Sequence, residues 1–299
     1  MTAAQTIPTA RKNLVVLRAG GKSLHRGWLG EGRTWDLAIS SFDSDRAADF
    51  PEAEFFDFYK GGKWDGIFRF FQLNPELLDR YEYIWLPDDD IEARCADIDR
   101  TFDLIRRYDL EVAQPALTRS SYFWHAITLQ CPLTRLRYTN CIEIMVPVLK
   151  RDLLRRALPY FETSRSGWGV DYIWCRLTSD PRRKCAVLDE VAMRHTRPVG
   201  SVLNKGAANV AANAEFKSLT SVMDVVSTRS VCFEAVTRWG FSVRGGLLCG
   251  ALQFLGQAPW LSRGHPSRPG PVAFAGSFYS HLRFKPDLTR LDGGQAGSV

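Results

Sequence analysis

Short apolar runs alternate along the first 200 residues with segments whose apolar residues recur at helical spacing. The runs at 13–21 (NLVVLRAGG), 35–43 (WDLAISSFD), 53–59 (AEFFDFY) and 185–195 (CAVLDEVAMRH) predict buried strands, as do 111–117 and 140–149. Residues 64–81 have the spacing of a helix. This alternation predicts an α/β fold.

One predicted strand ends in three carboxylates. The aromatic and β-branched run 81–87 stops at Asp88, Asp89 and Asp90. Carboxyl ends of strands in α/β sheets are where ligands usually bind. Asp88 and Asp90 would point to the same side of an extended chain, where they can share a divalent cation that prefers oxygen ligands. The alternative is an acidic loop that caps the following helix.

Composition and sequence patterns also limit the classes of protein to which this sequence can belong. The 299 residues carry a formal charge of +6, which suits an anionic ligand and equally a solvated basic surface. The sequence has no basic run, recognised motif or interleaved aromatics typical of nucleic-acid binding, and no apolar run long enough for an integral membrane segment. Residues 1–13 are expected to form a flexible leader. Seven scattered cysteines favour reduced thiols and a cytoplasmic location, with peripheral membrane association left open.

Five segments, in order over about residues 14–200, resemble the family known as domain of unknown function 707 (DUF707). They are GGKWDGIFRFF, YEYIWLPDDDIE, NCIEIMVPVL, SGWGVDYIWC and VLDEVAMRHTRPVG. The family is similar to glycosyltransferases of the GT-A fold. The resemblance implies a GT-A-like, Rossmann-like catalytic core at 14–200, with a mixed central sheet flanked by helices. It leaves residues 201–299 as a helical extension with a Gly/Pro-rich C-terminal segment.

The resemblance also implies a metal-dependent glycosyltransferase that uses a nucleotide-diphosphate sugar. Asp88, Asp90 and His195 would hold Mn²⁺ or Mg²⁺, and Asp171, after the glycine-flanked Trp168, would take the proton of the acceptor hydroxyl. The alternatives are a helix-capping Asp171 and a partly buried His195 with a backbone partner. A non-catalytic nucleotide- or carbohydrate-binding protein of the same fold is the competing hypothesis.

Further residues are expected around this centre. Contacts to a UDP- or GDP-sugar are predicted for Arg18, Asp43, Lys63 and Asp89. The acceptor, a glycan or small molecule with a free hydroxyl, is expected near Trp168 and Glu143. Each has a plainer alternative: a turn or loop residue, or a buried aromatic. Asp189 and Glu190 form a reserve acid–base pair, and His125 has no partner at metal-site spacing.

Overall fold

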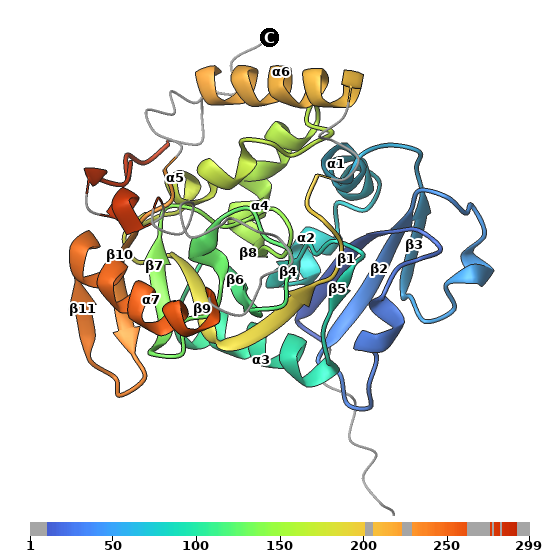
Figure 1. Ribbon diagram of the computed structural model, residues 1–299. Coiled ribbons are helices and arrows are strands. Elements are labelled where there is room, and N and C mark those ends of the chain that lie inside the picture. Colours follow the sequence, from blue (N-terminus) through green and yellow to red (C-terminus); the bar gives the residue numbers. More distant parts are fainter. Residues whose placement is uncertain are drawn as a thin grey trace, which may run out of the picture.

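The computed structural model describes residues 11–200, 206–222, 229–261, 276, 278–281 and 283–291. A mixed sheet crosses the molecule in the order β11-β10-β7-β9-β6-β8-β4-β1-β2-β3, and β5 pairs with β9 (Figure 1). The strands are β1 (Asn13–Ala19), β2 (Trp35–Ser41), β3 (Phe55–Phe58), β4 (Tyr83–Trp85), β5 (Ile91–Glu92), β6 (Val112–Leu117), β7 (Thr134–Thr139), β8 (Val148–Lys150), β9 (Cys185–His195), β10 (Cys232–Thr237) and β11 (Ser242–Arg244).

Helices cover both faces of this sheet. Successive β1 side chains point into two hydrophobic cores, one on each face of the sheet. Val15 and Leu17 pack with helix α3, whereas Leu14 and Val16 pack with α1, α4 and α5. Such two-sided burial explains the unbroken apolar run of β1. The α-helices are α1 (Lys63–Leu73), α2 (Leu77–Arg80), α3 (Cys95–Arg107), α4 (Arg151–Ala157), α5 (Trp174–Leu177), α6 (Gly206–Val222) and α7 (Gly246–Leu261). The 3₁₀ helices are η1 (His25–Trp28), η2 (Ala47–Asp49), η3 (Ala126–Thr128), η4 (Leu158–Phe161) and η5 (Val170–Tyr172).

Strand directions divide the sheet into two parts. Strands β1, β2, β3 and β4 are parallel, so their carboxyl ends meet at one edge. Beyond β4 the pairing becomes mixed, because β8 is antiparallel to both β4 and β6. The parallel part has the arrangement that places ligands at the carboxyl edge, and Asp88–Asp90 follow β4 at that edge.

Two predictions of secondary structure were wrong in detail. The strand expected at 140–149 forms only at β8, and the expected long helix at 64–81 is divided into α1 and α2. Its interruption lies at Asn74–Pro75, and Pro lacks the N–H that a continuous helix requires.

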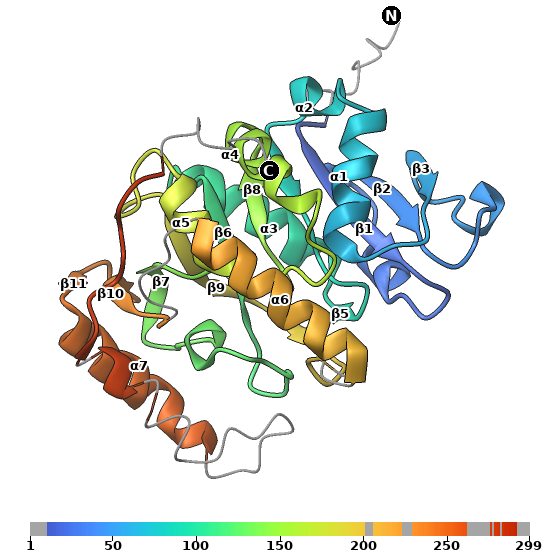
Figure 2. The ribbon, with the colours of Figure 1, turned by 90° about the horizontal axis from the view of Figure 1, so that it is seen from above.

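The region after residue 200 contains helices α6 and α7, as expected, and also two strands that were not expected. Strand β10 pairs with β7 and β11 pairs with β10, so this region extends the main sheet. Helix α7 lies beside these strands, whereas α6 lies away from them (Figure 2). Most of the expected leader and Gly/Pro-rich segment lies outside the described residues. Within the described part of the chain, no helix has the length and apolar character needed to cross a membrane.

Candidate functional site

The pairing of two short segments brings the predicted metal ligands together. After β4, the chain passes through Asp88–Asp90 into β5, which pairs antiparallel with the end of β9. Ile91 lies opposite His195 in this register, and the backbone N–H of Thr196 donates to the Asp90 carbonyl at 3.1 Å. Asp90 and His195, which are 105 positions apart in the sequence, therefore become neighbours.

Asp88, Asp90 and His195 each direct one ligand atom into a common space. These three atoms lie within 4.8 Å of one another, and Asp90 and His195 are buried. The Asp90 Oδ1 atom lies 3.3 Å from His195 Nε2 but has no hydrogen-bond partner in the described structure. Two ligands on adjacent corners of an octahedral ion lie about 3 Å apart, so the observed separation fits a shared Mn²⁺ or Mg²⁺.

The other imidazole nitrogen fixes the orientation of His195. Nδ1 lies 2.9 Å from the Tyr122 carbonyl, to which it donates, and this leaves the Nε2 lone pair facing Asp90. Metal-binding histidines usually have such a backbone partner. Burial acts to lower the pKa of His195, but the Asp90 carboxylate outweighs it and the pKa is raised. A divalent cation held by Nε2 and the Asp90 carboxylate would take the place of the Nε2 proton.

Lys63 also belongs to this cluster. Its ammonium donates to Asp88 Oδ1 at 2.6 Å and to the Ile144 carbonyl at 2.7 Å. Burial lowers the pKa of Lys63, against the opposing effect of the Asp88 carboxylate. Lys63 therefore forms an ion pair with Asp88 inside the cluster.

Asp89 faces away from this group toward the loop after β1. Its carboxylate accepts from Arg197 Nη1 at 2.9 Å and from the Gly20 N–H at 3.4 Å. Burial raises the pKa of Asp89, with Arg197 acting in the opposite direction. Asp43 accepts from the Gly21 N–H at 2.6 Å, so Asp43 and Asp89 both line the glycine turn at the carboxyl edge. A donor contact for either stays a prediction.

The structure argues against a direct donor contact by Arg18. This buried guanidinium donates to the carbonyls of Ser40, Tyr59, Gly61 and Gly62, and to the Ser40 hydroxyl. Its N–H groups are thereby used in joining the end of β2 to the loop before α1. Arg18 supports the loop that carries Lys63, which corrects the predicted role.

The predicted acceptor-side carboxylates form a second buried group. Asp171 Oδ2 lies 3.4 Å from Nε2 of His125, and Asp171 Oδ1 has no hydrogen-bond partner in the described structure. Glu143 Oε1 accepts from the Trp124 N–H at 3.1 Å, whereas its Oε2 also lacks a described partner. Burial raises the pKa of Glu143, and His125 acts against this rise.

Two glycines shape the turn before Asp171. Gly167 and Gly169 have φ of 74° and 100°, which side chains rarely adopt. A Cβ at Gly167 would also lie 2.0 Å from the Trp64 ring. Trp168 between them is half-buried, and its proposed stacking on a sugar stays a prediction. The residues that sequence spacing missed are His125 and Arg197, since their partners lie 46 and more than 100 positions away.

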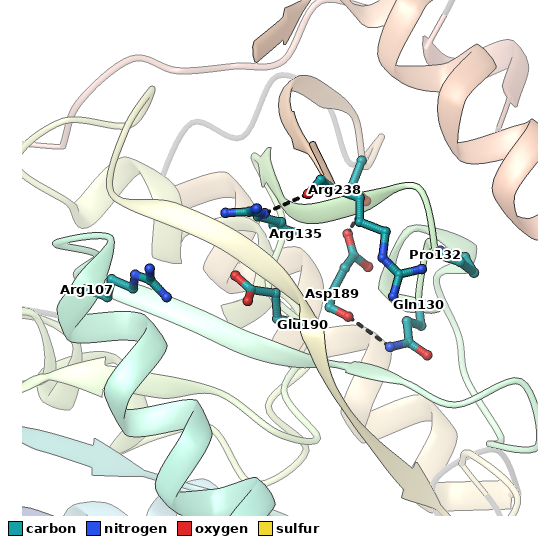
Figure 3. Close-up of a pocket in the computed structure, with 8 residues that line it drawn as sticks. Arg107, Gln130, Pro132, Arg135, Asp189, Glu190 and Arg238 are labelled. Carbon is teal, nitrogen blue, oxygen red and sulfur yellow. Dashed lines mark hydrogen bonds between the residues drawn. The ribbon is translucent and has the colours of Figure 1, made fainter. Parts of the chain in front are cut away.

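The reserve pair Asp189 and Glu190 lies elsewhere. A cavity of about 690 Å³ on the β7–β9 side is bordered by both residues and by Arg107, Arg135 and Arg238 (Figure 3). Asp189 accepts from buried Arg137 at 2.8 and 2.9 Å and from Thr134. Glu190 accepts from Arg100 and Tyr108. Both carboxylates are thus engaged in structural contacts, and none of the predicted metal or donor residues borders this cavity.

Residues 56–140, which include Lys63 and the three aspartates, match one family model. The match is to DUF707, described as a protein of unknown function. It confirms the DUF707 resemblance over these residues. No curated protein sequence matches the chain.

One solved structure confirms the GT-A-like fold, and two others are similar to a lesser degree. A structure of GalNAc-T7 with UDP, GalNAc and Mn²⁺ aligns with TM-score 0.52 and 7% identity, over 72% of this chain and 48% of that chain. The aligned part is thus about half of GalNAc-T7. TarS of S. aureus with UDP-GlcNAc gives 0.44 at 10% identity, over 70% and 71%. The mannosyltransferase PcManGT of Pyrobaculum calidifontis with GDP-Man and Mn²⁺ gives 0.42 at 9%, over 92% and 87%.

Proposed function

We propose that this protein is a metal-dependent glycosyltransferase, which moves a sugar from a nucleotide-diphosphate sugar to an acceptor hydroxyl. One observation carries the proposal: Asp88, Asp90 and His195 converge at the carboxyl edge of a GT-A-like sheet, with the buried Asp90 Oδ1 atom 3.3 Å from His195 Nε2. The fold alone would not support it, because a shared fold does not establish a shared reaction.

The residues suggest a division of roles. Asp88, Asp90 and His195 would hold Mn²⁺ or Mg²⁺, which supplies Lewis-acid stabilisation of charge on the departing nucleotide diphosphate. Lys63 would add a positive charge beside it, and Asp43 and Asp89 border the turn where the donor would lie. Asp171 is proposed to accept the proton of the acceptor hydroxyl as that oxygen attacks the sugar.

A binding protein without turnover is the second candidate. The observation that favours it is the Lys63–Asp88 ion pair, in which an ammonium already neutralises one carboxylate of the cluster. A nucleotide could then bind at this edge without a resident metal. The two candidates differ in the dependence of nucleotide binding on metal and in turnover.

Calorimetric titration of UDP and of GDP, with and without Mn²⁺, tests the metal. For the native protein we expect Mn²⁺ to strengthen the binding of one nucleotide by at least tenfold. Asp90→Asn should abolish that enhancement, because the amide is a neutral and weaker ligand. Asp103→Asn, on the exposed face of α3, is the matched control and should behave as the native protein.

Turnover is tested with UDP-glucose, UDP-galactose, UDP-GlcNAc and GDP-mannose, by measuring release of the nucleoside diphosphate in the presence of Mn²⁺ and sugar acceptors. Release that requires Mn²⁺ and disappears in Asp90→Asn supports the transferase. Metal-enhanced binding with no release from any donor supports the binding protein. Nucleotide binding that is indifferent to Mn²⁺ would reject the metal role.

A further inference from the structure

His125 lies at the centre of the acceptor-side group. Its Nε2 faces Asp171 Oδ2 and the Tyr172 hydroxyl, each at 3.4 Å, and its Nδ1 lies 3.3 Å from the Ser230 hydroxyl. Glu143 is held beside it, because the N–H of the preceding residue, Trp124, donates to Glu143 Oε1. Two carboxylates thus flank one imidazole.

The two oxygens of Asp171 are not equivalent. Oδ2 faces the imidazole, whereas Oδ1 is buried and has no hydrogen-bond partner in the described structure. The residue as a whole is 8% exposed. A buried carboxylate tends to take up a proton unless a positive charge compensates it, and a protonated carboxyl group cannot serve as a base. His125 is a basic group placed to supply that charge.

The surrounding groups favour a proton on His125. Burial acts to lower its pKa, but hydrogen bonding to Asp171 and the charge of Glu143 outweigh burial, and the pKa is raised. The other titratable groups that face it are Tyr172, from η5, and Cys141, which precedes Glu143 in the chain. Burial raises the pKa of both groups, so they remain neutral and add no competing charge.

We infer that His125 is the positioning residue of the acceptor side: as an imidazolium shared by Asp171 and Glu143, it holds Asp171 Oδ2 and leaves Oδ1 free to accept a proton. This inference rests on the proposed transferase function for its catalytic meaning. In the reaction, the acceptor O–H proton passes to Asp171 Oδ1 while the acceptor oxygen bonds to the anomeric carbon. The bond from that carbon to the diphosphate oxygen breaks, and its electron pair leaves with the nucleotide diphosphate.

A bound metal is the competing explanation of the same geometry. Ligand atoms of His125, Cys141 and Asp171 lie within 4.8 Å of one another, and a His–Cys–carboxylate set is typical of zinc. Structural zinc sites almost always have four protein ligands, whereas this group offers three in the described structure. We therefore favour the proton, and zinc becomes an outcome of the test.

The first test needs no substrate. NMR of the histidine ring signals between pH 5 and 9 gives the pKa of His125, with its signal assigned by its absence from His125→Gln. We expect a pKa above the ordinary value of about 6.5, and a decrease of about one unit, or tenfold in proton affinity, in Asp171→Asn. Asp103→Asn should leave the His125 signal unchanged. An unaltered His125 pKa in Asp171→Asn would overturn the inference. So would one zinc per protein in metal analysis that is lost in Cys141→Ser.

The second test separates this inference from the proposed function. His125→Gln should keep the Mn²⁺-dependent nucleotide affinity of the native protein. It should lower kcat for donor turnover by about 10²-fold, and the pH profile of kcat should shift. Equal loss in nucleotide affinity and kcat would indicate a merely structural role and reject the inference. If the native protein turns over no donor, the transferase proposal fails, while the NMR result still decides whether His125 and Asp171 share a proton.

Discussion

Lys63 places a charge where the metal is proposed. Removing it therefore separates its effect on the binding of Mn²⁺ from its effect on the binding of the nucleotide. We expect Lys63→Gln to strengthen the binding of Mn²⁺ alone, since the carboxylates lose a competing cation 2.6 Å from Asp88. The same change should weaken nucleotide binding in saturating Mn²⁺, because a positive charge beside the diphosphate is lost. Calorimetry with Mn²⁺ alone, and then with UDP and GDP, measures both. Weaker Mn²⁺ binding in Lys63→Gln would contradict this reading of the ion pair.

Arg137 and Asp189 form an ion pair that is 1% and 0% exposed at the side chains. Asp189→Ala would leave the guanidinium buried without its partner, which typically costs about 3–5 kcal/mol. Urea unfolding should show this loss, while Asp103→Ala on the exposed face of α3 should change stability by less than about 0.5 kcal/mol. A loss below about 1 kcal/mol for Asp189→Ala would mean that water reaches Arg137.

The candidate residues show what a sequence pattern can reveal. The three aspartates stand out because they are consecutive and follow a strand signal, whereas the metal role of His195 was expected only from the resemblance to GT-A glycosyltransferases. His125 could not be predicted, since its partner Asp171 comes from a separate loop and no local spacing connects them. The role of Arg18 was misjudged because the sequence does not show how many carbonyls surround its guanidinium.

At the scale of elements, α6 is joined to the turn before Asp171 by one carboxylate. Glu215 accepts from the backbone N–H groups of Arg165 and Ser166 and from the Ser166 hydroxyl at 2.6 Å. Hydrogen bonds to a charged group contribute about 1.5–3 kcal/mol. Glu215→Ala should therefore raise hydrogen exchange across Gly206–Val222 and hasten tryptic cleavage at Lys217. Glu76→Ala, an exposed carboxylate before α2, is the control. Unchanged exchange in Glu215→Ala would show that apolar packing alone holds α6.

The wrong strand at 140–149 has a physical explanation. Ile142 and Val146 are buried in opposite cores of the sheet, so the alternation of apolar residues reports burial on two sides. It does not require a ladder of hydrogen bonds. Conversely, β7 (TRLRYT), β10 (CFEAVT) and β11 (SVR) are short and contain charged residues, and no strand was predicted there. Strands that are buried against apolar residues on both faces, such as β1 and β9, were predicted correctly.

At the scale of the whole molecule, the described residues after 228 complete the sheet. Strand β7 pairs with β9 on one side and β10 on the other, and Arg183 donates to Glu234 at 2.7 Å across this junction. A chain that ends at residue 200 would leave β7 as an exposed edge, which is prone to pair with other copies. We expect that fragment to form oligomers in light scattering at concentrations where residues 1–299 do not. A monomeric, stable fragment would show that β10 and β11 are dispensable.

The loop at 118–125 has a consequence for how the two ligands affect each other. At Tyr122 it fixes the ring of His195, and three residues later it carries His125. If this loop shifts when the nucleotide and metal bind, His125 shifts with it, and the affinity for the acceptor changes by some factor. Thermodynamic reciprocity then requires the acceptor to change the nucleotide affinity by the same factor. We therefore expect donor and acceptor to bind cooperatively, with each raising the affinity for the other by the same factor.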